Sequence, residues 1–477
     1  MTLTVLFLYA LLIIAVGMRR SGSDADGFFF ASRHLGPLWI GATLTASWIG
    51  AASTLVTMKQ AREAGYAALW VMAIPTLLTL LVFFLITGRI RRIRFTTLPE
   101  LVRRTYGTRV AGAAAGLIFM YMILLTASQF IAWGQLLGSG FSIPYAAAVW
   151  IGGALVLTYS VSGGFLSVVR TDLMQLVLLT IALGLIFLFS TAESSAPVTP
   201  ALTQFLSGAA DNLLLVFSFT LAWVISPVVW QRIVAAESRR SARLGILFAA
   251  VAVWILYLMV IPAGMNLGSC AAPDAELLNC LMHSLPSWAG GVIFLGFGSA
   301  ILSTADTGLN LAAMTLNLDF TAKRFSHSLR AARWSTLIAG GLAILAALRL
   351  RSILQTLGTA SEIMASGLFV PGMAALILKT PAPRAGACSL MAGGGFALLS
   401  SMNAFGLPLS LPHWPQSLPW GLALSLAGFF CGYALDRRPR PGAGGAECSS
   451  RHFEQGLSRN GADGCSDKAC DRSSLKA

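Results

Sequence analysis

Polar side chains interrupt an apolar stretch at residues 298–320, GSAILSTADTGLNLAAMTLNLDF. If this stretch is a helix, Ala300, Ser303, Thr304 and Thr307 follow i, i+3, i+4, i+7 spacing and share one face. Hydroxyl and carbonyl oxygens are hard ligands that suit a small, hard cation. The spacing therefore indicates a cation site, with hydroxyls that bond back to their own helix as the alternative.

Asp306 and Asn310 form a row beside that face. A carboxylate that is ionised and unpaired near the centre of a membrane is costly, so it must hold a cation or a proton. A structural carboxyl group, satisfied by Asn310 or by a neighbouring helix, is the alternative. The row should in each case face the protein interior or a wet cavity.

The composition is that of a polytopic membrane protein. Of the 477 residues, 56% are hydrophobic and 11% are charged, whereas soluble proteins carry about 25% charged residues. Mean hydropathy is +0.74. The apolar runs are near the ~20 residues that cross a bilayer as a helix, and they predict an all-α protein with about 13 transmembrane helices. The predicted spans are 2–18, 38–58, 66–88, 110–138, 144–161, 169–191, 210–231, 244–267, 287–318, 334–350, 353–378, 385–403 and 418–436.

The net charge of +14 is distributed as the positive-inside rule requires. If the first connection is cytoplasmic, the cytoplasmic loops hold most of the arginines, including seven between residues 89 and 109. The predicted outer loops hold only Lys59, Arg62, Arg349 and Arg351. The asymmetry places the N-terminus outside and the C-terminus in the cytoplasm. Basic charge in this chain sets membrane topology and does not predict a nucleic-acid surface.

Two predicted membrane helices are interrupted. LTASWIGAAST (44–54) gathers small and hydroxyl residues around Gly50, and LAWVISPVVW (221–230) places Pro227 in mid-helix, where it removes a hydrogen bond and should kink the chain. These helices begin two units of five spans, at residues 38–191 and 210–378. Breaks at matching positions of two halves favour an inverted-repeat transporter with its site at the breaks. Close packing of small residues is the alternative for each break.

The remaining features concern the domain organisation, nucleotide-binding motifs and cysteines. We expect residues 1–437 to form the transmembrane transporter domain and 438–477 a disordered cytoplasmic tail, because the tail lacks large apolar residues. There is no P-loop and no dinucleotide-binding glycine pattern, so a nucleotide-driven pump or a nucleotide-using enzyme is not expected. Cys270 and Cys280 share a predicted outer loop and either pair or remain free thiols.

Four stretches resemble the sodium:solute symporter family, the relatives of the sodium–glucose, proline and pantothenate symporters. They are GFFFASRHLGPLWIGATLTASWIGAAS (27–53), YSVSGGFLSVVRTDLMQ (159–175), WQRIVAAES (230–238) and SAILSTADTGLN (299–310). The resemblance covers about residues 1 to 440. It implies two inverted five-helix repeats with one helix before them and two after. It also implies that the protein is not an enzyme and that Na⁺ is its coupling ion, with no organic cofactor.

The resemblance further implies a sodium site between the first and eighth core helices. Its ligands would be the carbonyl groups of Ala46, Ile49 and Ala300 and the hydroxyl groups of Ser303 and Thr304.

Some family members bind a second sodium ion, which would lie in this chain at Asp172, Asp306 and Thr307. Asp306 stands where relatives carry Ser or Thr, so it either strengthens a second cation site or carries a proton. For Asp172, a charge at the start of a helix near the cytoplasmic face, next to Arg170, is the alternative.

The sequence says less about the identity of the solute than about the sodium site. Sugar-transporting relatives place Asn, and the proline transporter Asp, where this chain has Trp48. An indole cannot supply that hydrogen-bonding pattern, which disfavours a sugar and puts proline in doubt. Indole faces attract quaternary ammonium groups, but packing or interface anchoring is the alternative for each tryptophan. The candidate solute-binding residues are Trp48, Ser53, Gln129, Trp133, Trp223, Ser226 and Glu362.

The sequence thus predicts a sodium-coupled secondary symporter of the plasma (inner) membrane that imports a small organic solute by alternating access. Its partners would be the solute and the lipid bilayer, without nucleic acid or an obligatory protein partner. Proton coupling through Asp306 is one alternative. A solute sensor of the same fold that does not transport is another.

Overall fold

The computed structural model describes residues 2–18, 25–30, 33–93, 95–190, 201–265, 285–320, 328–378, 380–402 and 409–437. In these residues the structure is helical and contains no β-strand. The first half holds α1 (Thr2–Gly17), α2 (Ala25–Phe30), α3 (Pro37–Trp48), η2 (Ala52–Val56), α4 (Thr57–Ala64), η3 (Gly65–Trp70), α5 (Ala73–Ile93), α6 (Leu98–Tyr106), α7 (Thr108–Phe141), α8 (Tyr145–Ser190) and α9 (Ala201–Asp211). The second half holds α10 (Leu213–Ile225), α11 (Pro227–Ala235), α12 (Arg239–Met265), α14 (Ser287–Thr315), η4 (Leu316–Phe320), α16 (Leu329–Arg349), α17 (Ile353–Met364), η5 (Ala365–Phe369), α18 (Val370–Ile377), α19 (Pro383–Ser389), η6 (Leu390–Gly394), α20 (Gly395–Ser401) and α21 (Leu418–Arg437).

The all-helical fold confirms the predicted class. Helices cover the predicted apolar runs wherever the structure describes them, and 9 helical stretches are long and apolar enough to cross a membrane. Two of these, Ala52–Ile93 with 42 residues and Tyr145–Phe189 with 45 residues, are about twice the ~20 residues that one crossing needs. Thirteen crossings and two inverted repeats remain predictions.

The helix α8 joins two runs that the sequence separates, 144–161 and 169–191. Its backbone leaves helical geometry at Gly164, with φ 60° and ψ −156°. A Cβ atom on Gly164 would lie 2.5 Å from the carbonyl oxygen of Phe28. Glycine at this position therefore permits both the left-handed backbone and the close approach of α2.

The first predicted break lies where the sequence places it. The helix α3 ends at Trp48, and Ile49 has φ −88° and ψ 72°, outside helical geometry. The chain resumes as the π-helical turn η2 and then as α4. A helix that ends inside the protein leaves backbone carbonyl groups without intrahelical partners, so other groups must satisfy them.

The second break is complete rather than a kink. The helix α10 ends at Ile225, Ser226 is extended, and Pro227 begins α11. Proline suits this position because the first helical N–H has no intrahelical acceptor. The indole of Trp230 donates to the carbonyl of Val224 at 2.9 Å and satisfies one of the freed groups.

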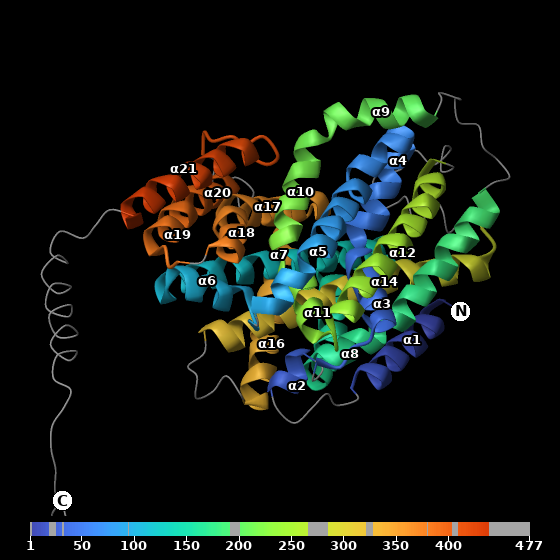
Figure 1. Cartoon of the computed structure of the whole chain (residues 1–477). Helices are drawn as coiled ribbons and strands as arrows, with labels where there is room; N and C mark the ends of the chain where they lie inside the picture. Colours follow the sequence, from blue (N-terminus) through green and yellow to red (C-terminus); the bar gives the residue numbers. More distant parts are fainter. Residues whose placement is uncertain are drawn as a thin grey trace, which may run out of the picture.

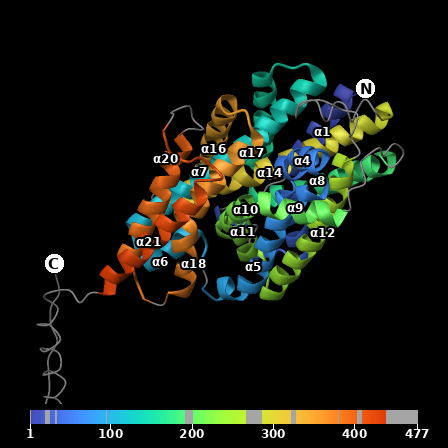
Figure 2. The same ribbon diagram turned by 90° about the horizontal axis from the view of Figure 1, so that it is seen from above.

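The broken helices lie in the interior. Figure 1 places α1 at one end of the molecule and α19–α21 at the opposite end, with α3, α7, α11 and α14 between them. Figure 2 also shows α7, α11 and α14 between α1 and α21. The most apolar window of Leu213–Ala235, which contains the second break, is 67% buried, and those of Trp288–Phe320 and Ile353–Ile377 are each 78% buried, against 28% for Leu418–Arg437. These central helices are therefore packed inside the protein, and the last helix faces the surroundings.

The connections that lead into α3 and out of α11 pair with each other. Leu35 donates to the carbonyl of Ala235 at 3.1 Å, and Glu237 donates to the carbonyl of Leu35 at 3.0 Å. This isolated parallel bridge holds the two broken helices together at one end.

The predicted orientation can be tested directly. A reporter fused after Arg437, the last residue of α21, should lie in the cytoplasm. A thiol or glycan tag at 271–279, outside the described residues, should be external. Detection of both tags on the same side of the membrane would contradict the predicted span count.

The loop with Cys270 and Cys280 and the tail 438–477 also lie outside the described residues.

Candidate functional site

Two hydroxyl groups of α14 meet the broken end of α3. Ser303 Oγ lies 2.9 Å from the carbonyl oxygen of Ala46 and 3.0 Å from that of Ala300. Thr304 Oγ1 lies 3.3 Å from the carbonyl oxygen of Ser47 and 3.2 Å from that of Ala300. The structure thus brings together four of the five predicted sodium ligands in one buried cluster of oxygens.

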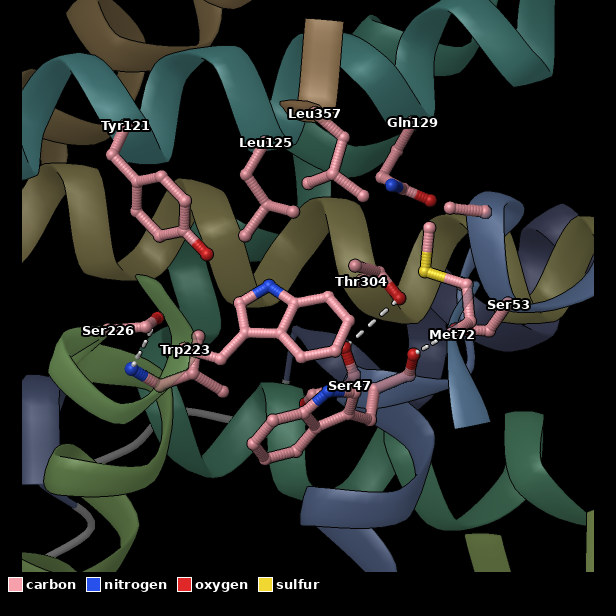
Figure 3. Close-up of a pocket in the computed structure, with 14 residues that line it drawn as sticks. Ser47, Ser53, Met72, Tyr121, Leu125, Gln129, Trp223, Ser226, Thr304 and Leu357 are labelled. Atoms are coloured by element: carbon pink, nitrogen blue, oxygen red, sulfur yellow. Dashed lines mark hydrogen bonds between the residues drawn. The ribbon is translucent and has the colours of Figure 1, made fainter. Parts of the chain in front are cut away.

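The fifth predicted ligand, Ile49, is fully buried at the break itself. The next residue, Gly50, permits the close approach of three helices. A Cβ atom on Gly50 would overlap the Thr304 hydroxyl and lie 2.8 Å from Gln129 Oε1. Gln129 also accepts a hydrogen bond from the Ala51 N–H at 3.0 Å. Figure 3 shows Gln129 and Thr304 in one view with Ser47 and Ser53, which lie before and after the break.

A buried ion pair lies beside the oxygen cluster. Arg232 Nη2 of α11 is 3.7 Å from Asp172 Oδ2 of α8, and both side chains are 0% exposed. Thr43 donates to Asp172 Oδ2 at 2.5 Å and accepts from Arg232 Nη2 at 3.0 Å. Arg232 Nη2 also donates to Ser47 and, at 3.1 Å, to Thr307. A guanidinium group therefore lies among residues that the sequence assigned to a second cation.

Asp172 lies inside the protein between α3, α8 and α11, not at a surface. Arg232 was not predicted as a site residue. The predicted span 210–231 ends one residue before Arg232, whereas the apolar stretch Leu213–Ala235 of the structure includes it. An arginine within an apolar membrane stretch is a candidate functional residue by default. Its partners could not be identified, since one sequence does not say which helices pack together.

Asp306 lies on α14 beside the oxygen cluster and faces α8. Its Oδ2 accepts hydrogen bonds from the Tyr159 hydroxyl at 2.9 Å and from Thr171 at 3.3 Å. Its Oδ1 has no hydrogen-bond partner among the described residues. Asn310 instead accepts from Gln231 at 2.9 Å. The carboxyl group is thus satisfied in part by a neighbouring helix, and one oxygen remains available.

Five predicted solute-binding residues line one central pocket: Trp48, Ser53, Gln129, Trp223 and Ser226. The Trp48 and Trp223 rings meet edge to face, with centroids 5.8 Å apart. None of the residues that line the pocket carries a charged side chain.

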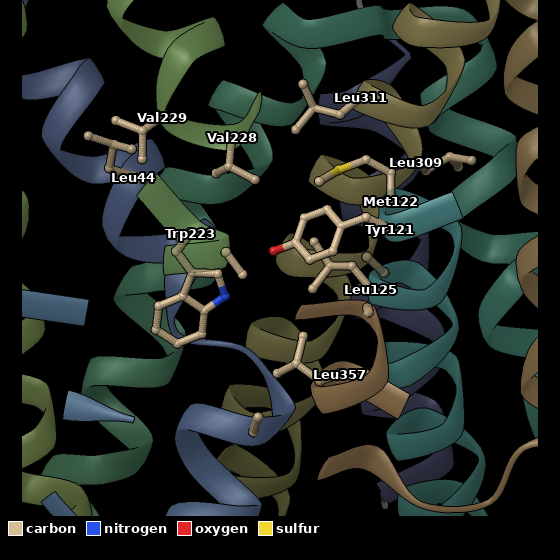
Figure 4. Packing of buried hydrophobic residues seen from close by; sticks show 14 of the residues in the cluster. Leu44, Tyr121, Met122, Leu125, Trp223, Val228, Val229, Leu309, Leu311 and Leu357 are labelled. Carbon is tan, nitrogen blue, oxygen red and sulfur yellow. The ribbon is translucent and has the colours of Figure 1, made fainter. Parts of the chain in front are cut away.

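The pocket is small. Its free volume is about 50 Å³, whereas one water molecule takes ≈ 30 Å³ of liquid. Side chains must therefore move to admit an organic solute. Figures 3 and 4 show the groups that enclose it, with Tyr121, Leu125 and Leu357 facing Trp223.

The other two candidates lie elsewhere. Trp133 is 1% exposed and packs closely against Gly152 and Gly298, so it fills space between helices. Glu362 lines a separate cavity of about 510 Å³ together with His413. Its helix α17 presents Leu357 to the central pocket and Glu362 to the second cavity.

Two interrupted membrane helices with a buried cluster of oxygens at the break and a pocket beside it are typical of ion-coupled secondary transporters. The model of the sodium:solute symporter family matches residues 28–393. The chain therefore belongs to the sodium:solute symporter family, as the four sequence stretches predicted, and it is a multi-pass membrane protein.

Curated relatives and a solved structure agree with this assignment. The chain is 25% identical over 433 residues to the sodium/pantothenate symporter of Escherichia coli (strain K12), with 83% of this chain and 88% of the relative covered. It is 23% identical over 346 residues to the sodium/proline symporter of Staphylococcus aureus (strain Newman), with 67% of each covered. The fold matches a Na⁺-coupled sialic acid symporter in its substrate-bound outward-open state, with a TM-score of 0.73, 17% identity, and 91% of this chain and 97% of that chain covered.

Proposed function

We propose that this protein is a sodium-coupled symporter that imports a small organic solute by alternating access. The observation that carries the proposal is the meeting of Ser303 and Thr304 with the freed carbonyl groups of α3. These neutral oxygens are hard ligands of the kind that bind Na⁺. Membership of the family supports sodium as the coupling ion.

The proposed ion would draw two helices together. Ser303 and Thr304 now donate their hydroxyl protons to carbonyl groups. When Na⁺ binds, those protons turn away, and the five oxygens of Ala46, Ile49, Ala300, Ser303 and Thr304 face the ion. Because the ligands come from both α3 and α14, occupancy stabilises the arrangement in which these helices touch.

The solute would bind in the central pocket. Indole faces of Trp48 and Trp223 suit an apolar or cationic group of the solute, and Ser53, Gln129 and Ser226 offer hydrogen bonds. An anionic solute would find no positive charge among the lining residues, whereas the indole faces can still attract an ammonium group. We therefore propose a small solute that is neutral overall or carries an organic ammonium group.

The decisive experiment is counterflow in proteoliposomes with a panel of labelled solutes. A solute accepted by the pocket should exchange in Na⁺ and lose most of its exchange when K⁺ replaces Na⁺. Full exchange without Na⁺ would contradict sodium coupling. Binding of a solute without counterflow would instead support the sensor of the same fold.

A second cation is proposed at Asp306. Arg232 already provides a positive charge to Asp172, whereas the second buried carboxyl group, Asp306, is bonded only by the Tyr159 and Thr171 hydroxyl groups among the described residues. If both are ionised, one further cation or proton is needed to balance them. The unpartnered Oδ1 of Asp306 is where it would bind.

The substitution Asp306→Asn distinguishes a second Na⁺ from a proton at this carboxyl group. If Asp306 helps to bind a second Na⁺, the change should lower the steepness of ²²Na⁺ binding against Na⁺ concentration and leave the main site intact. A proton carrier would instead show a flatter pH dependence with the sodium curve unchanged. We expect the first result. Asp211→Asn, at an exposed carboxyl group, is the control and should change neither curve.

A further inference from the structure

Four basic side chains surround one hollow that lies away from the transport site. A cavity of about 670 Å³ opens between α5, α6, α12 and α18. Three apolar spans end or begin beside it, namely Ala52–Ile93, Arg239–Met265 and Ile353–Ile377. The cavity therefore lies at the depth where hydrocarbon gives way to lipid headgroups, on the face that we predict to be cytoplasmic.

Four arginines line this cavity: Arg89, Arg92, Arg104 and Arg239. No Asp or Glu is among the lining residues. Guanidinium groups stay charged at every physiological pH. Within the described part of the chain, Arg92 and Arg239 form no hydrogen bond or ion pair through their side chains, and both are exposed. The cavity thus offers positive charge that the protein does not neutralise.

The positive charge of one of the four arginines is offset by a carboxylate. Arg104 forms an ion pair with Glu100 at 2.5 Å. Burial raises the pKa of Glu100, but bonds from the Thr96 N–H and from Arg104 outweigh it, and the pKa lies below its ordinary value. Glu100 is therefore ionised at neutral pH and offsets Arg104. The remaining three arginines leave a net excess of positive charge.

The backbone of the protein positions two of these arginines. Arg89 Nε donates to the carbonyl of Leu376 at 2.6 Å, which ties α5 to α18. The guanidinium of Arg239 lies against Gly88, where a Cβ atom would overlap it. The arginines are therefore held around the cavity.

The rim of the same cavity is apolar and open. Leu85 is 65% exposed and Ile377 is 63% exposed, and both line the cavity. Each lies in a membrane-spanning stretch, so acyl chains can cover them. A free phosphate would use the arginines but leave this rim without a partner.

We propose that this cavity binds the headgroup of an anionic phospholipid, with its phosphate among Arg89, Arg92 and Arg239 and its acyl chains along Leu85 and Ile377. Basic pockets between membrane helices suit such headgroups. The lipid would join α5, in the first predicted repeat, to α12 and α18, in the second. This site is independent of the sodium and solute sites.

The test compares lipids on the purified full-length protein. Phosphatidylglycerol should raise the melting temperature in detergent and remain bound in native mass spectra, and phosphatidylcholine should do neither. R92Q/R239Q should weaken phosphatidylglycerol binding by roughly thirtyfold, because each basic residue near an anionic lipid contributes to affinity. R109Q/R330Q removes the same charge from exposed positions outside the cavity and should keep the wild-type response.

Three results would overturn the proposal. The first is an equal response of both double variants to phosphatidylglycerol. The second is no preference for phosphatidylglycerol over phosphatidylcholine in the wild type. The third is the same shift with glycerol phosphate, since a free anion would then account for the arginines.

Discussion

Arg232→Gln is expected to destabilise the folded protein by roughly 3–5 kcal/mol, the cost of breaking a buried ion pair from one side. The guanidinium has 0% exposure and contacts Asp172, Thr43, Ser47 and Thr307. Its removal leaves the Asp172 carboxylate buried without its counter-charge. A large fall in melting temperature and in the yield of monodisperse protein should follow.

The matched variant removes both charges. Replacing a buried ion pair with apolar residues of similar size is often neutral, so Arg232→Met with Asp172→Leu should recover much of the lost stability. Arg330→Gln, at an exposed position, should change stability by no more than about 0.5 kcal/mol. A single Arg232→Gln variant as stable as the wild type would show that the pair does not contribute to the fold.

Ser303→Ala and Thr304→Ala should each weaken Na⁺ binding by roughly tenfold or more, because a contact to a charged group contributes about 1.5–3 kcal/mol. Each substitution removes one hydroxyl ligand from a proposed set of five oxygens. Stabilisation of the purified protein by Na⁺ against thermal unfolding measures the change, since it depends on the ratio of ion concentration to dissociation constant.

Two controls make this result specific. Thr304→Ser keeps the hydroxyl and should retain most of the affinity. Thr315→Val removes a buried hydroxyl of the same helix, one that bonds only to the Leu311 carbonyl among the described residues. It should leave Na⁺ binding unchanged. Equal Na⁺ stabilisation of the wild type and both alanine variants would rule out this cluster as the sodium site.

The sequence allowed the helical class, the two breaks and the oxygen cluster to be predicted. The class, the breaks and the hydroxyl face of residues 300–310 depend on local information: length and polarity of runs, small residues around Gly50, Pro227, and the spacing of Ser303 and Thr304. The meeting of that face with Ala46 and Ile49 was implied only by the resemblance to the family. Pro227 was predicted to kink one helix. It begins a new one instead, because Ser226 takes an extended backbone and Trp230 satisfies a freed carbonyl.

Features that depend on which helices pack together could not be predicted. Arg232 meets Asp172 and Thr307 only because α11, α8 and α14 converge. Residue type alone also made Trp133 and Glu362 resemble solute ligands. Trp133 packs between helices, and Glu362 lies on the face of α17 that points away from the central pocket.

The position of Thr304 has a thermodynamic consequence. Its hydroxyl belongs to the proposed sodium cluster, and its side chain also lines the central pocket. Two ligands that share one group cannot bind independently, and linkage requires each to change the affinity of the other by the same factor. Titration of solute at several Na⁺ concentrations, and of Na⁺ at several solute concentrations, should therefore return one coupling constant.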